Sequence, residues 1–301
     1  MDGLTRAAAR AAGLRLLAAA FDAPPAGEDL SRLTQVSRLP DLDEEAVAEE
    51  HCAVFDRDVV PLAGLFLDAE GRGGGPLVAY LAQHFQSLGA PTPTTPESLP
   101  AQLRGLAWLC AAEADARTDD RDAEVRRMRG MQRRWLDAVL LPWLPAFVAA
   151  VARTGRPWAT GLAAETQDLC LHLRADLGPG EEPEGPPGPE VPDLDAASTD
   201  LGAIARWLST PAASGLFLGR HVLERLGRST EVPKGFGGRQ LMLGNLLRSA
   251  AHLDAFGAVL DGLDAEVAAY RAELPAGGIG APWQRRLDVT AAVLDRLRDA
   301  Q

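Results

Sequence analysis

The sequence predicts an all-α fold, and its composition supplies the main reasons. The chain of 301 residues contains only two Ile and two Tyr, so residues that favour strands are scarce. Ala, Leu, Arg and Glu, which favour helices, are abundant. Hydrophobic residues make up 47% and charged residues 24%, as in an ordinary folded protein of one large or two small domains.

Apolar residues spaced three and four apart predict the helices of the first part of the chain. We expect helices over residues 3–21, 43–56, 76–88, 98–116, 120–140 and 158–174. Pro24 and Pro25 end the first helix, and Pro76 occupies the favoured first turn of the third. The helix over 98–116 is apolar nearly all round, which predicts a central position in a helical bundle.

Residues 178–193, GPGEEPEGPPGPEVPD, have the composition of an extended linker. We therefore expect a helical domain over residues 1–177, and an additional helical region over 194–301 packed on it. Within that region Ser198 or Thr199 begins a helix. Three more helices follow, over residues 238–252, 255–273 and 283–300.

Charge and hydropathy exclude several classes of partner. The net charge of −12 makes nucleic acid an unfavourable partner. No apolar run approaches the roughly 18–20 residues that span a bilayer, and Arg10 and Arg15 interrupt the stretch where a secretory signal would lie. The three cysteines form no CxxC pair. We expect a cytoplasmic protein with no membrane span and no nucleic-acid partner.

Motifs for catalysis are also missing, so we expect no catalytic residue, no metal site and no cofactor. The five histidines form no HExxH pattern, and there is no GxSxG elbow. The run DDRD, residues 119–122, loosely resembles the magnesium-binding motif of all-α isoprenoid synthases. The supporting pattern has Asn245 and Ser249, but Leu253 at its third position. A magnesium-dependent all-α enzyme is kept as an alternative.

Two glycine-rich segments precede predicted helices, where backbone N–H groups can receive an anion. They are GRGGGP (71–76) and KGFGGR (234–239), which contains the single lysine of the chain. Neither matches a known nucleotide-binding pattern.

Four motifs, taken in order, resemble the TorD/DmsD/NarJ family of molybdoenzyme-assembly chaperones. They are EHCAVF (50–55), VPLAGLFLDAEG (60–71), TPESLPAQLRGLAWL (95–109) and LLPWLPAFVAAVARTGRPW (140–158). Glu97-Ser98 departs from the Asp-His or Asp-Tyr common in that family. The C-terminal region has no counterpart in its compact members.

The resemblance implies a chaperone and not an enzyme. Such a chaperone binds the immature catalytic subunit of a molybdenum-dependent oxidoreductase, its twin-arginine signal peptide, or both. It assists cofactor insertion before export. The resemblance also implies weak guanine-nucleotide binding and a homodimer formed by helix exchange through the linker. A helical adaptor or scaffold without a molybdoenzyme client is the other alternative.

A receptor for a twin-arginine peptide requires an apolar groove rimmed by carboxylates, because guanidinium groups pair with carboxylates in a bidentate manner. For every candidate, ordinary packing or a solvated charge is the competing interpretation. The candidates for the apolar floor are Phe55, Pro61, Phe66, Leu99 and Trp108, those for the acidic rim are Glu50, Asp68 and Glu97, and His51 and Ser98 complete the set.

Overall fold

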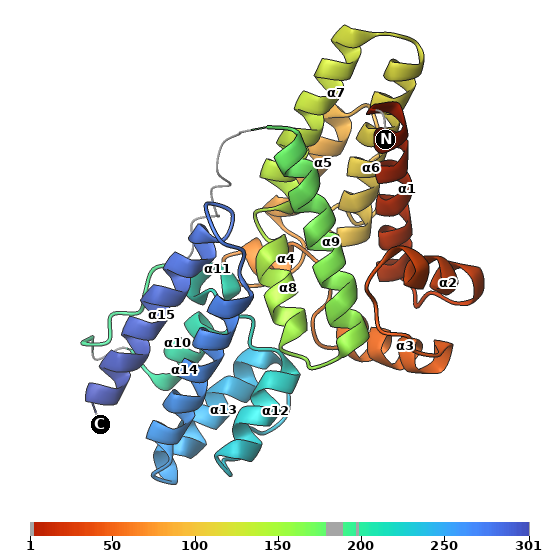
Figure 1. Cartoon of the computed structure of the whole chain (residues 1–301). Coiled ribbons are helices and arrows are strands. Elements are labelled where there is room, and N and C mark those ends of the chain that lie inside the picture. The colour runs from red at the N-terminus through yellow and green to blue at the C-terminus, as the bar shows by residue number, and fades with distance from the viewer. Residues whose placement is uncertain (1–2, 179–188, 197–198, 301) are drawn as a thin grey trace. The chain divides into compact units, whose positions relative to one another are not determined.

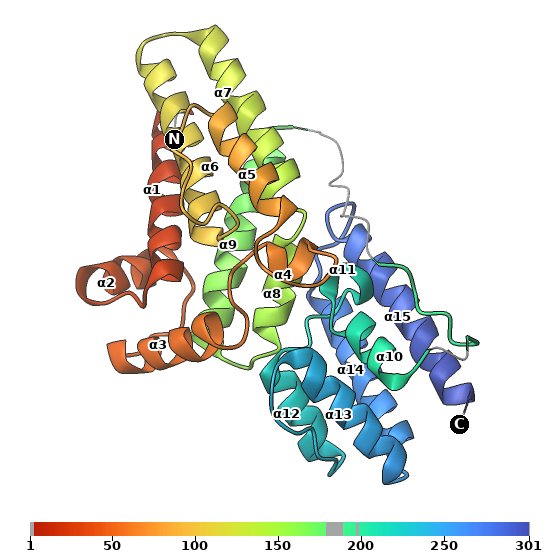
Figure 2. The same ribbon diagram turned by 180° about the vertical axis from the view of Figure 1, so that it is seen from behind.

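The computed structural model describes residues 3–178, 189–196 and 199–300 (Figures 1 and 2). Over these residues the chain forms fifteen α-helices and two π-helical turns, with one isolated β-bridge between Leu62 and Ser98 and no strand. The predicted all-α fold, a helical bundle followed by an additional helical region, is confirmed. Most of the predicted linker over 178–193 lies outside the described residues.

The chain divides into two compact units. Unit 1 comprises residues 1–64, 73–144 and 156–183, and unit 2 comprises residues 65–72, 145–155 and 184–301. Two short segments that precede the predicted linker therefore belong to the same unit as the C-terminal helices. The linker composition does not indicate this division, because it depends on contacts between residues far apart in the chain.

In unit 1, helix α6 packs against α1, α7 and η2 and is buried along most of its length. This unit contains α1 (Gly3–Asp22), α2 (Gly27–Val36), α3 (Glu44–His51) with η1 (Cys52–Asp56), α5 (Pro76–Ser87), α6 (Leu99–Thr118), α7 (Asp122–Trp135) with η2 (Leu136–Leu140), and α9 (Pro157–Asp176). The helices predicted over 43–56 and 120–140 thus both end in a π-helical turn.

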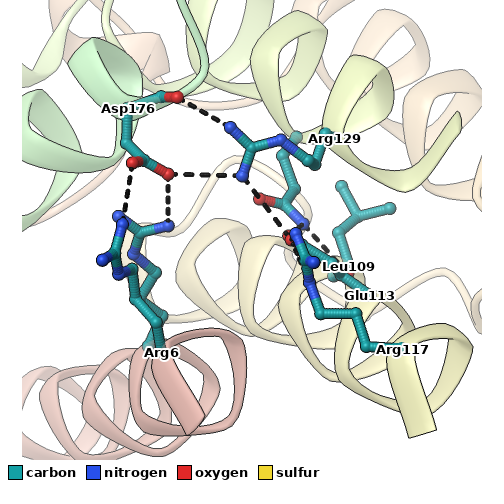
Figure 3. Close-up of polar contacts among 8 residues, drawn as sticks. Arg6, Leu109, Glu113, Arg117, Arg129 and Asp176 are labelled. Atoms are coloured by element: carbon teal, nitrogen blue, oxygen red, sulfur yellow. Dashed lines mark hydrogen bonds and ion pairs between the residues drawn. The ribbon is translucent and has the colours of Figure 1, made fainter. Parts of the chain in front are cut away.

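A network of charges connects α1, α6, α7 and α9 (Figure 3). The carboxylate of Asp176 accepts hydrogen bonds from Arg6 (3.1 Å), Arg10 (3.0 Å) and Arg129 (3.2 Å). Arg129 also lies 3.5 Å from the buried carboxylate of Glu113. Hydrogen bonds from Arg10 and Arg129 hold the pKa of Asp176 below its usual value. The arginines offset the unfavourable position of an acidic residue at the C-terminus of α9.

Unit 2 contains the helices of the C-terminal region together with α8, which lies between two prolines of the fourth motif. Its helices are α4 (Gly64–Leu67), α8 (Leu144–Ala152), α10 (Leu201–Leu208), α11 (Pro211–Ser214), α12 (Arg220–Ser229), α13 (Arg239–His252), α14 (Phe256–Glu273) and α15 (Ala281–Asp299). The first residues of α4 and α8, Gly64 and Leu144, are assigned to unit 1.

An aromatic cluster forms part of the core of unit 2. The ring of Phe66 stacks on that of Phe217 with 5.0 Å between centroids, and meets the ring of Phe147 edge-on at 6.0 Å. The hydroxyl of Tyr270 donates a hydrogen bond of 2.6 Å to the carbonyl oxygen of Phe217. This contact holds the segment between α11 and α12 against α14.

A buried carboxylate joins α12 and α14 to the end of α8. Glu266 accepts hydrogen bonds from Arg153 Nε (2.9 Å) and Nη2 (3.2 Å), and from Arg225 Nη2 (2.7 Å). Its side chain is 5% exposed. A buried carboxylate requires such partners, because desolvation of the charge is otherwise costly.

Five helices (α2, α4, α8, α11 and α12) are not among those predicted from the sequence, and one predicted helix start is wrong. All five have ten residues or fewer, and α2 buries only Leu33. Helices of this length depend on tertiary packing more than on their own sequence. The predicted start of α10 at Ser198 or Thr199 is wrong for Thr199, and Ser198 lies outside the described residues. The side chain of Asp200 caps α10 by accepting the N–H of Ala203 at 2.7 Å.

Candidate functional site

Glu50 lies in α3, and its carboxylate caps another helix. Glu50 Oε2 accepts the backbone N–H groups of Trp158 (2.8 Å) and Ala159 (3.1 Å) in the first turn of α9. These N–H groups have no acceptor within their own helix, and a carboxylate also interacts favourably with the helix dipole. Glu50 is only 7% exposed. Its contacts therefore give it a role in folding, and its place in the predicted binding site stays a prediction.

His51 and Phe55 pack in the core between α1 and the α3–η1 helix. Both side chains are 2% exposed. The ring of Phe55 meets the rings of His51 and Phe21 edge-on, with centroids 5.3 Å and 5.0 Å apart. Burial lowers the pKa of His51, and the nearby charge of Asp56 opposes this effect. Burial thus favours the neutral form of the His51 imidazole.

Four predicted residues lie together at the start of α6. The backbone of Leu99 donates to the carbonyl oxygen of Pro61, and Ala63 donates to that of Glu97, both at 2.9 Å. The hydroxyl of Ser98 caps α6. Pro61 and Leu99 are buried. The short antiparallel pairing of residues 61–63 with 97–99 thus brings two of the sequence motifs into contact.

Glu97 has a buried carboxylate with one oxygen unused. Its Oε1 accepts the N–H of Gly74 at 2.9 Å, and its Oε2 has no hydrogen-bond partner in the part of the chain that the structure describes. Glu97 is 5% exposed. A Cβ at Gly73 would lie 3.2 Å from Oε1, so the glycines cover the carboxylate closely. An unsatisfied buried acceptor is costly and is available to a donor from a ligand.

The glycine run was the sequence signal for this arrangement. The backbone N–H groups of residues 71–76 can receive an anion, and in the structure the N–H of Gly74 donates to the carboxylate of Glu97. Gly74 has a φ angle of 96°, which residues other than glycine rarely adopt. The loop therefore depends on glycine at this position.

Phe66 and Asp68 belong to unit 2, whereas the other eight predicted residues belong to unit 1. Phe66 is fully buried in the aromatic cluster. Asp68 is half-buried, and its carboxylate accepts the N–H of Glu70 at 2.8 Å within a turn.

Trp108 differs from the other predicted apolar residues because it is 40% exposed. Phe55, Phe66 and Leu99 are all 2% exposed or less. A tryptophan with a large exposed face is typical of protein-binding surfaces, because the ring offers a large contact area at a low entropy cost. Trp108 lies on α6, nine residues after Leu99.

The described residues offer little for catalysis. They contain no group of three or more His, Cys, Asp or Glu side chains arranged to hold a metal ion. The acidic run over 119–122 lies at the turn from α6 to α7, where Asp119 pairs with Arg121 at 2.8 Å. Burial raises the pKa of Cys110 and of Cys170 to about 12, so neither thiol ionises at neutral pH.

Among the described helices, none taken singly has both the length and the apolar character needed to cross a membrane. The bent pair Asp122–Leu140 and Leu144–Ala152 meets the criteria of length and composition when its two helices are taken together.

Comparison with known proteins gives two matches. Residues 9–149 match the nitrate reductase delta subunit family. The chain is also similar to the selenate reductase assembly chaperone protein of Thauera selenatis, with 30% identity over 159 residues. That match covers 50% of this chain and 81% of the relative. The family match includes the start of α6 and Trp108.

Proposed function

The chain belongs to the nitrate reductase delta subunit family of non-catalytic redox-enzyme assembly chaperones, and we propose that its client is a molybdenum-dependent oxidoreductase. It binds the immature catalytic subunit, or the twin-arginine signal peptide of that subunit, in the cytoplasm and assists cofactor insertion before export. The similarity to a protein named as a selenate reductase assembly chaperone carries this proposal.

Glu97 is the proposed acceptor for an arginine of the client. A guanidinium group that reaches Glu97 Oε2 forms a charge-assisted hydrogen bond with an oxygen that otherwise lacks a partner. Such bonds contribute about 1.5–3 kcal/mol, because the carboxylate is already desolvated before the client arrives. Gly73 and Gly74, which cover Glu97, carry no side chains, so only their backbone has to move for a guanidinium group to reach Oε2.

Trp108 is the proposed apolar contact. Its exposed ring lies on the same helix whose N-terminus adjoins Glu97. A signal peptide combines guanidinium groups with an apolar stretch, so a carboxylate and an exposed tryptophan in the same unit suit both of its parts.

The test is an affinity purification of the tagged full chain from its native host, grown anaerobically, with co-purifying proteins identified by mass spectrometry. We expect a molybdoenzyme catalytic subunit, enriched in its cofactor-free form. Recovery of other proteins without such a subunit would overturn the proposal and favour a helical adaptor.

Variants then test the two site residues. Glu97→Gln keeps an acceptor for the Gly74 N–H and removes the charge, and we expect client affinity to fall about tenfold. Trp108→Ala should reduce client binding with little loss of stability, because the side chain is partly exposed. The matched control is Glu45→Gln, an exposed carboxylate on α3. Equal client recovery by all variants would remove Glu97 and Trp108 from the site.

A further inference from the structure

Unit 2 contains a pocket of about 510 Å³ that the proposed function does not use. Three segments far apart in sequence line it: residues 70–72, helix α10 with the following Ser209, and residues 238–248, which include most of α13. Its volume lies within the range of small-molecule sites. Most of its lining residues lie beyond residues 9–149, so the inference does not depend on the family match.

The pocket is strongly basic in a protein whose net charge is −12. Its charged lining consists of four arginines, Arg72, Arg206, Arg239 and Arg248, and one carboxylate, Glu70. Glu70 lies 3.2 Å from Arg72 and pairs with it. The remaining positive charge of this pocket therefore favours an anion.

Two of the arginines have no carboxylate partner among the residues that the structure describes. The guanidinium group of Arg206, on α10, forms no ion pair or hydrogen bond there, and the residue is exposed. Arg248 donates only to neutral oxygens, the carbonyl of Gly244 (3.0 Å) and the side chain of Asn245 (2.8 Å). Both guanidinium groups are thus available to bind an anion.

Arg239 is held in place by the aromatic cluster. Its guanidinium carbon lies 4.0 Å from the centre of the Phe217 ring, and Phe217 in turn stacks on Phe66. A Cβ at Gly71 would lie 3.9 Å from Arg239 Nη2, so the turn at 70–72 closely approaches this arginine. A guanidinium group fixed by stacking loses little conformational entropy when it binds a ligand.

The N-terminus of α13 also faces the pocket. Gly238 precedes this 14-residue helix and no side chain caps it, while Gln240 and Leu241 of its first turn line the pocket. Uncapped N–H groups and the helix dipole favour an anion at such a point. The two glycine segments noted in the sequence thus both contribute residues to one pocket.

We propose that this pocket binds the diphosphate group of a small molecule. Guanidinium groups from three segments surround the pocket, and a single phosphate is too small to contact most of them. Two linked phosphates present enough oxygens for bidentate contacts to Arg206, Arg239 and Arg248 and for the first turn of α13. The diphosphate belongs either to free pyrophosphate or to a larger organic ligand.

The test is isothermal titration calorimetry of the full chain at low ionic strength with inorganic pyrophosphate and, separately, with adenosine diphosphate. We expect pyrophosphate to bind, and its affinity to fall about tenfold in Arg206→Gln and in Arg248→Gln. Added salt should also weaken binding. The matched control is Arg228→Gln, an exposed arginine of α12 that does not line the pocket.

The outcomes separate the alternatives. Equal affinities for the two ligands support free diphosphate, and a higher affinity for the nucleotide supports a larger ligand. No binding of either ligand, or the same affinity in Arg206→Gln, Arg248→Gln and wild type, would overturn the proposal. Binding of an oligoglutamate peptide without binding of pyrophosphate would overturn it too and would indicate an acidic protein segment as the ligand. Circular dichroism verifies that each variant is folded.

Discussion

Replacing Glu50 tests whether this residue stabilises the fold or contacts the client. The sequence motif places Glu50 in the binding site, whereas the structure shows its carboxylate capping α9. Glu50→Ala removes the acceptor of two backbone N–H groups in the interior. We expect this variant to unfold more easily than the wild type.

The magnitude follows from the contacts. Each hydrogen bond to a charged group contributes about 1.5–3 kcal/mol, and the two bonds share one oxygen, so their contributions are not additive. The interaction with the helix dipole is part of the same effect. We expect Glu50→Ala to lower the free energy of unfolding by about 3 kcal/mol. Glu50→Gln retains an acceptor and should lower it by about 1 kcal/mol.

The assay is urea unfolding of the full chain, followed by circular dichroism. The control is Glu49→Ala, which removes the neighbouring carboxylate, 68% exposed and paired with Arg156 at 3.1 Å. An exposed ion pair contributes less than about 1 kcal/mol, so this variant should resemble the wild type. The reasoning is refuted if Glu50→Ala unfolds at the same urea concentration as the wild type. If client binding were lost in that case, Glu50 would be a client contact.

Three further outcomes are expected. Because burial holds the pKa of His51 below 6.5, the unfolded chain binds the extra proton first as pH falls through about 6.5. The free energy of unfolding of the wild type therefore falls between pH 7.5 and 5.5. Urea unfolding should show a smaller fall for His51→Leu than for the wild type, and an equal fall in both would contradict this reasoning. Gly105→Ala should destabilise by about 1–3 kcal/mol because its Cβ would lie 2.5 Å from the ring of Trp135, while Gly130→Ala should stabilise slightly. A gain in melting temperature for both would show that α6 and α7 separate easily. Glu266→Ala should cost about 2–3 kcal/mol by leaving two partly exposed arginines without their carboxylate, and an unchanged melting temperature would contradict this.

Most helices were predictable because their signals are local. Apolar spacing, prolines at first turns and the scarcity of strand formers identified nearly all the long helices within a few residues of their ends. Five helices of ten residues or fewer (α2, α4, α8, α11 and α12) were missed, since helices of this length depend on packing against other elements. The π-helical turns after α3 and α7 have no recognised sequence signal.

The candidate site was predictable only in part. The motifs around residues 50–71 and 95–109 indicated which segments to examine, and the pairing of Pro61 with Leu99 brings two of them together. Their spacing did not show that Glu50 caps α9 or that Trp108 is exposed. These properties depend on which elements pack on each residue.

The sequence by itself determined the helical class, the positions of the long helices and the resemblance to a family, because each is recorded in residues close together along the chain. Tertiary structure decided which carboxylate accepts the N–H groups at the start of a helix, which carboxylate keeps an oxygen without a hydrogen-bond partner, and which arginines line one pocket. Burial and the proximity of charges depend on residues far apart in sequence. Arg72, Arg206, Arg239 and Arg248 line one basic pocket only because the chain folds them around it.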